Sequence, residues 1–220
     1  RLPMVLTWLV LALILGVIAY FMAPQGPLKT AVGVAAGAWI AFGTLRFVWQ
    51  RVRGGGRFTA EMLGMVLAHF GVAVFLIGAL LVEAQSSQRE LAMKPGETVE
   101  IGGYGFRFQG VDETHGPNYT SDIGHVQVLR DGQLLLRLDP EKRAYVAGGQ
   151  VMTEAGIRPG AFGDLYVALG ESLGDGAWAV RVHIKPFVRW IWMGALLMAL
   201  GGFVTATDKR FRRVAEARIA

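Results

Sequence analysis

The stretch that decides the fold is EMLGMVLAHFGVAVFLIGALLVEA, which runs from Glu61 to Ala84. About 20 apolar residues in a helix cover the roughly 30 Å hydrocarbon core of a bilayer, so this stretch is long enough to span a membrane. Between Glu61 and Glu83 its one ionisable residue is His69. Because a polar group in hydrocarbon costs free energy unless it has a partner, an intramembrane histidine is a candidate functional residue.

Two roles for His69 stay open on the residues alone: a neutral imidazole hydrogen-bonded to a neighbouring helix, or an axial ligand to haem iron. One face of the predicted helix, four of whose five residues are small, would let a second helix or a flat ligand approach closely. The residues on this face are Gly64, Ala68, Gly71, Phe75 and Gly78. The apolar neighbours of the histidine suit a porphyrin and ordinary helix packing equally well. These neighbours are Met65, Val66, Val72 and Ala73.

The composition indicates a membrane protein. Of the 220 residues 53% are hydrophobic, and the mean hydropathy is +0.40. The chain has no cysteine, so it forms no disulfide and carries no attachment point for a c-type haem. The formal net charge is +5, and its basic residues flank apolar stretches, which favours membrane topology over nucleic-acid binding. Because Arg1-Leu2-Pro3 leads directly into an apolar run, we expect a segment of a longer membrane protein.

Four membrane helices are predicted, three of them within residues 1–84 and the fourth within 187–220. Their approximate ranges are 4–22, 30–49, 61–84 and 187–206. Arginine and lysine concentrate in the connector at 46–57 and in the tail at 208–220, whereas the turn at 24–29 holds one lysine. Positively charged loops stay in the cytoplasm, so the connector and the tail are predicted to be cytoplasmic and residues 85–186 periplasmic.

Residues 85–186 differ in character, because short alternating runs are separated by turn signals. This pattern predicts about seven antiparallel strands, at 98–101, 104–111, 123–130, 134–138, 143–147, 164–169 and 177–184. Asp131-Gly132 is a typical two-residue hairpin turn between two of them. About 100 residues suffice for a small sandwich or barrel with its own core. The predicted fold is therefore an α-helical transmembrane protein with an inserted all-β periplasmic domain.

This β domain shows little catalytic chemistry. His115, His125 and His183 do not have the spacing of a metal site. Acidic residues at predicted strand ends are usually solvated, and Asp112, Glu113 and Asp164 fit that description. No nucleophile motif is present, so no catalytic residue is assigned and the domain is interpreted as a binding or scaffolding module.

Several stretches, in the same order along the chain, resemble the C-terminal part of the CcmF/NrfE family, the haem lyase subunits of the bacterial cytochrome c maturation system. The resemblance runs from about Arg57 to Gly202. The stretches are GMVLAHFGVAVF at 64–75, GPNYT at 116–120, LDPEKRAY at 138–145, MTEAGI at 152–157, DLYVALGE at 164–171 and GAWAVRVHIKPFVRWIWMGALLMALGG at 176–202.

The resemblance implies a multi-pass protein of the bacterial inner membrane that binds a b-type haem between two histidines on different helices. His69 matches one of these two iron ligands. Members of the family are expected to work with the haem chaperone CcmE, with CcmH and often CcmI, and to attach haem to the CxxCH thiols of apocytochrome c. The resident haem is expected to relay electrons to the haem on the chaperone.

Other family elements are expected to lie in the rest of the CcmF chain. They are the tryptophan-rich WWD segment, the two periplasmic histidines beside it and the second intramembrane histidine. His115, His125 and His183 do not match those positions. We therefore expect the 220-residue chain by itself to lack enzymatic activity. One alternative is a structural subunit without a cofactor, whose helices anchor a β domain that docks CcmH or a cytochrome. A transporter fits less well, because no paired broken helices are visible.

Overall fold

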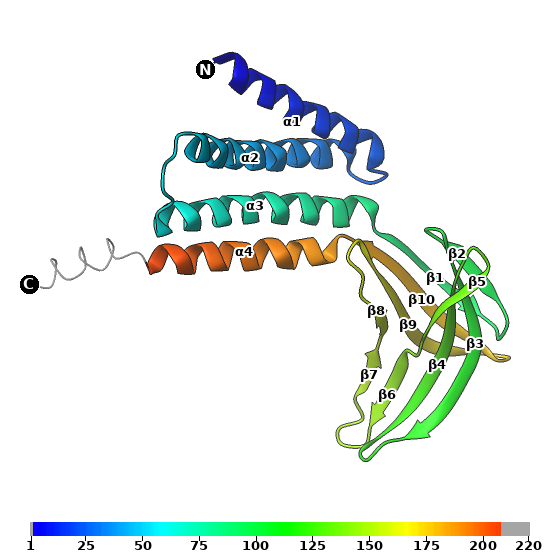
Figure 1. Ribbon diagram of the computed structural model, residues 1–220. Helices are drawn as coiled ribbons and strands as arrows, with labels where there is room; N and C mark the ends of the chain where they lie inside the picture. The colour runs from blue at the N-terminus through cyan, green and yellow to red at the C-terminus, as the bar shows by residue number, and fades with distance from the viewer. Residues whose placement is uncertain (1, 208–220) are drawn as a thin grey trace, which may run out of the picture. The chain divides into compact units, whose positions relative to one another are not determined.

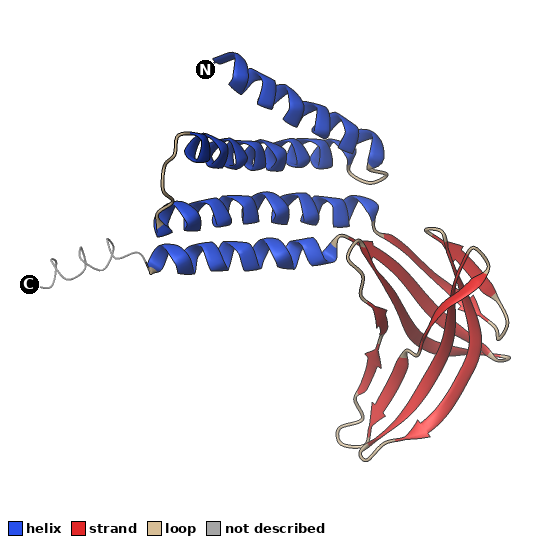
Figure 2. Ribbon diagram, in the orientation of Figure 1, coloured by secondary structure: helices blue, strands red, loops and turns tan. Residues whose placement is uncertain are grey.

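The computed structural model describes residues 2–207, which form two compact units (Figures 1 and 2). A helical unit contains the chain up to Gln85 and again from Phe187, and a β unit runs from Ser86 to Pro186. The basic tail predicted at 208–220 lies outside the described residues.

The helical unit consists of α1 (Leu2–Met22), α2 (Pro27–Arg53), α3 (Ala60–Gln85) and α4 (Val188–Ala206). Within residues 2–207 these four helices are long and apolar enough to cross a membrane. The second helix is longer at both ends than the predicted span of 30–49. It begins early because Pro27 occupies its first turn, where a missing N–H costs nothing, and Gly26 caps it in the left-handed conformation with φ 57°.

Glycines bring α3 and α4 into close contact, and these two helices lie side by side in Figure 1. A Cβ atom added at Gly71 would lie 2.8 Å from the carbonyl oxygen of Gly194, and one added at Gly201 would lie 2.6 Å from the nitrogen of Ala68. The small-residue face predicted on the third helix therefore receives another helix. On the other side of α3, Gly33 and Gly37 of α2 face Leu80 and Ile77.

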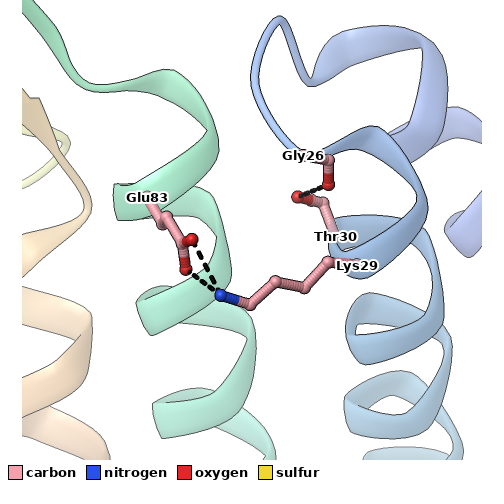
Figure 3. Close-up of polar contacts among 4 residues, drawn as sticks. All are labelled: Gly26, Lys29, Thr30 and Glu83. Carbon is pink, nitrogen blue, oxygen red and sulfur yellow. Dashed lines mark hydrogen bonds and ion pairs between the residues drawn. The ribbon is translucent and has the colours of Figure 1, made fainter.

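A charge pair joins the beginning of α2 to the end of α3 (Figure 3). Lys29 Nζ donates hydrogen bonds of 2.7 and 2.6 Å to the two carboxylate oxygens of Glu83. One residue on, the buried Thr30 donates its hydroxyl to the carbonyl of Gly26 over 3.1 Å, which satisfies that hydroxyl within its own helix. The Lys29–Glu83 pair thus links the beginning of α2 to the end of α3, as expected for two antiparallel neighbouring helices.

The β unit is a sandwich of two antiparallel sheets, which confirms the predicted fold class. One sheet has the order β1-β10-β9-β8, and the other has the order β2-β3-β4-β6-β7, with β5 also paired to β4. The strands are β1 (Ser87–Met93), β2 (Thr98–Ile101), β3 (Tyr104–His115), β4 (Tyr119–Arg130), β5 (Gln133–Leu138), β6 (Glu141–Tyr145), β7 (Val151–Glu154), β8 (Gly156–Arg158), β9 (Gly163–Gly174) and β10 (Ala177–Pro186).

The core of the β unit lies between the two sheets. Its fully buried side chains include Phe106 and Phe108 from β3 and Val167 and Val182 from β9 and β10. The predicted hairpin at Asp131-Gly132 is confirmed: both residues have positive φ angles, 52° and 77°, and the flanking Arg130 pairs with Gln133. Positive φ at both turn residues is the geometry that suits Asp-Gly.

Candidate functional site

His69 lies on α3 with its side chain exposed at the surface of the helical unit. Its Nδ1 atom is 2.9 Å from the carbonyl oxygen of Met65, one turn earlier. A carbonyl only accepts hydrogen bonds, so Nδ1 carries the proton and Nε2 keeps its lone pair. Within residues 2–207 no side chain or backbone group is bonded to Nε2. Histidines that bind metals are commonly held in this way, with the second ring nitrogen donating to a carbonyl.

An open groove of about 290 Å³ lies beside the imidazole, between α2 and α3. It is lined by Trp39, Ile40, Gly43, Thr44 and Phe47 of α2, and by Met65, Val66 and His69 of α3.

The lining of this groove is almost entirely apolar. Thr44 does not change that, because its hydroxyl donates to the carbonyl of Ile40 over 2.8 Å. A Cβ atom added at Gly43 would meet no other heavy atom within 4 Å, so the groove is open above this glycine. Of the predicted neighbours of His69, Met65 and Val66 line the groove, whereas Ala73, one turn further along α3, is buried and does not line it.

The imidazole of His69 and the residues that line the groove have the chemistry that a haem group requires. The imidazole presents a free Nε2 lone pair, the flanking surface is apolar and aromatic, and no charged side chain lines the groove. Ligand pockets usually measure roughly 300–1,000 Å³ and enclose most of their ligand. The groove beside His69, at about 290 Å³ and open on one side, falls just below that range and does not enclose a ligand by itself.

His125 of the β unit lies between two carboxylates that the sequence analysis did not connect with it. Its Nδ1 is 2.7 Å from Asp139 Oδ1, and its Nε2 is 3.0 Å from Asp112 Oδ2. The hydrogen bond to Asp139, more than the one to Asp112, raises the pKa of His125, and partial burial opposes them. In the imidazolium form both ring nitrogens donate, so this residue links β3, β4 and the β5–β6 connection.

The other two histidines of the β unit make separate local contacts. His183 packs edge-to-face on Tyr166, with ring centroids 5.1 Å apart, and burial lowers its pKa, assisted by the charges of Lys185 and Arg181. His115 is 73% exposed and lies 4.0 Å from Glu113. Among the described residues, no group of three or more His, Cys, Asp or Glu side chains is placed to hold a metal ion.

Comparison with known proteins identifies the family. Residues 84–186 match the family described as the CcmF C-terminal beta-sandwich. The chain is 50% identical over 188 residues to the cytochrome c-type biogenesis protein CcmF of Pseudomonas aeruginosa, an alignment that covers 83% of this chain and 29% of that protein. It is 44% identical over 184 residues to CcmF of Escherichia coli, covering 84% of this chain and 28% of that protein.

The chain belongs to the CcmF family. A solved structure titled cytochrome c heme lyase CcmF has the same fold, with a TM-score of 0.77 at 20% identity over 92% of this chain and 34% of that one. The resemblance found in the sequence is thereby confirmed. The chain spans about three tenths of the length of these two CcmF relatives. Together with its four apolar helices, this family membership makes it a multi-pass membrane protein.

Proposed function

We propose that this chain is a haem-handling segment of a cytochrome c biogenesis protein, in which His69 ligates the iron of a b-type haem. The observation that carries the proposal is the free Nε2 of His69 at the edge of an apolar groove between α2 and α3. The relatives named as cytochrome c-type biogenesis proteins support the pathway.

The groups around His69 would prepare its imidazole to bind iron. The carbonyl of Met65 fixes the tautomer and the orientation of the imidazole ring. The ring would therefore lose little further conformational freedom on binding iron. Trp39 and Phe47 line the groove with apolar rings, which would lower the dielectric constant around a bound haem. A haem bound there, with His69 as one of its ligands, would supply one-electron redox chemistry.

The second iron ligand, the location of the β unit and the partner proteins are proposed from the resemblance to the CcmF/NrfE family. The second iron ligand would come from the rest of the CcmF chain. The β unit would lie in the periplasm and position partners, among them the haem chaperone CcmE, CcmH and CcmI. With them the complete protein would transfer haem to apocytochrome c in the inner membrane.

The test is His69→Ala in the complete membrane protein, with reduced-minus-oxidised optical spectra of the purified sample. Loss of the low-spin b-type haem band is expected, because the iron loses one axial ligand. The matched control is His115→Ala, which removes an exposed imidazole of the β unit and should leave the spectrum unchanged. A full haem band in the His69→Ala protein would refute the ligand assignment.

A second variant separates the groove from the ligand. Gly43→Leu fills the groove, and the space around this glycine is open enough for the helices to keep their packing. We expect reduced haem content with unchanged helix content by circular dichroism. Normal haem content in both variants, with partner binding lost on substitution of β-unit surface residues, would instead favour a structural docking subunit without a cofactor.

A further inference from the structure

A second and larger groove lies between the beginning of α1 and the end of α2, away from His69. Its volume is about 860 Å³, and most of its lining is apolar. The lining residues are Met4 and Trp8 of α1, and Leu45, Arg46, Val48, Trp49, Gln50, Val52 and Arg53 of α2. The groove therefore combines an apolar wall with two arginines near the end of a membrane-spanning helix.

Two side chains that line this groove each contain a buried hydrogen-bond donor without an acceptor. The donors are Nε1 of Trp8 and Nε of Arg46, neither of which has a partner within residues 2–207. A buried donor left unpaired costs free energy, and in the hydrocarbon core of a bilayer no water supplies the missing acceptor. These two atoms are covered by the chain itself, so they lie within the wall of the groove and not at its surface.

The residues that line the same groove include two arginines and no acidic residue. Arg53 places its guanidinium 4.5 Å from the centre of the Trp49 ring, and neither Arg46 nor Arg53 pairs with a carboxylate in the described part of the chain. Arg51 differs, because its guanidinium donates to the carbonyl of Arg57 over 3.2 and 2.9 Å. Two arginines therefore remain available at the groove, about 10 Å apart along the helix axis.

We propose that this groove binds one anionic phospholipid. Its acyl chain would lie on the apolar wall that includes Met4, Leu45 and Val52, and Arg46 and Arg53 would bind its phosphate. Guanidinium groups match phosphate oxygens in geometry and charge, and basic pockets beside membrane helices are typical sites for anionic lipid headgroups. A purely apolar helix in the groove would leave both arginine charges unpaired, which is why an anionic lipid fits better.

The experiment measures lipid binding to the complete membrane protein in detergent, by native mass spectrometry with added phosphatidylglycerol or phosphatidylcholine. The wild type should bind phosphatidylglycerol preferentially. The double variant Arg46→Gln/Arg53→Gln should lose about tenfold in affinity for phosphatidylglycerol only. The matched control is Arg89→Gln, which removes an exposed arginine of β1 and should change nothing. Equal binding of both lipids by the wild type, or unchanged binding by the double variant, would overturn the proposal.

A second measurement covers the case in which the double variant fails to fold. A photoreactive amino acid in place of the exposed Val52 leaves both arginines intact and reports what lies in the groove in native membranes. An adduct with a phospholipid is the expected product. An adduct with a polypeptide segment would show that a protein helix occupies the groove and would overturn the lipid proposal. Neither measurement depends on haem binding at His69.

Discussion

His125 connects three elements of the β unit through its contacts with Asp112 and Asp139, and these contacts make its protonation part of the folding equilibrium. The folded state raises its pKa above the ordinary value of 6.5. A histidine with a raised pKa contributes stability that is fully present below the unfolded pKa. That contribution is lost as the pH rises through the folded pKa.

The β unit should therefore lose some stability as the pH rises from 6.5 upward, and His125→Asn should remove that part of the pH dependence. Because the His125 side chain is 41% exposed, the effect should stay within about 0.2–1 kcal/mol. Urea unfolding of the β unit at several pH values measures it. His183, whose pKa is lowered, contributes the opposite slope, with stability lost as the pH falls. An identical pH profile for His125→Asn and wild type would contradict the prediction, and exposed His115→Asn is the control.

The sequence alone identifies candidate residues more readily around His69 than around His125. His69 can be proposed as a candidate from sequence, because it is a single ionisable residue within an apolar span. Its neighbours Trp39 and Phe47 could not be found, because nothing local shows which face of α2 meets α3. The pairing of Asp112 with His125 depends on the register of β3 on β4, which shifts at a bulge between Phe108 and Gly110.

Glycines determine how closely the elements of the helical unit pack, and Gly194 is the sharpest case. A Cβ there would lie 2.5 Å from the nitrogen of Phe75 and 2.7 Å from the carbonyl oxygen of Gly71. Both are backbone atoms, which cannot move without displacing α3. Gly194→Ala should therefore separate α3 from α4 and cost about 1–3 kcal/mol.

The measurement is the thermal stability of the purified complete protein in detergent. Gly202→Ala is a matched control on the same helix, because a Cβ there meets nothing within 4 Å. This control should be neutral or slightly stabilising, since alanine favours helix more than glycine. Equal melting temperatures for the two variants would show that the α3–α4 contact does not depend on this close approach.

A strand is easiest to predict from sequence where its alternation matches the burial of its side chains. The alternation of β2, with its buried Val99 and Ile101, gave the bounds of that strand directly. β7 and β8 were missed because β7 is exposed along its whole length and β8 has three residues. β1 was missed as well, since it is mostly exposed until the buried Met93. These three are edge strands, so their pairing comes from a neighbouring strand rather than from their own periodicity.

At the scale of the whole molecule, the surfaces of the helical unit and the β unit suit different surroundings. The helical unit exposes apolar side chains over most of α1, as a surface in contact with lipid or other helices requires, whereas the β unit buries an apolar cluster between its two sheets. Each unit therefore has its own source of stability. The β unit needs no membrane for its core, although both of its ends continue into membrane-spanning helices.

Residues 86–186 should accordingly fold alone as a soluble all-β domain with a cooperative unfolding transition. Phe106→Ala removes a fully buried side chain from the centre of its core and should cost about 3–5 kcal/mol. That is a large share of the roughly 5–15 kcal/mol that stabilises a typical domain. Circular dichroism during urea unfolding measures both effects. Leu134→Ala, at a position 52% exposed on β5, should change stability by less than about 0.5 kcal/mol. A fragment without a cooperative transition would mean that the core depends on the helical unit for its folding.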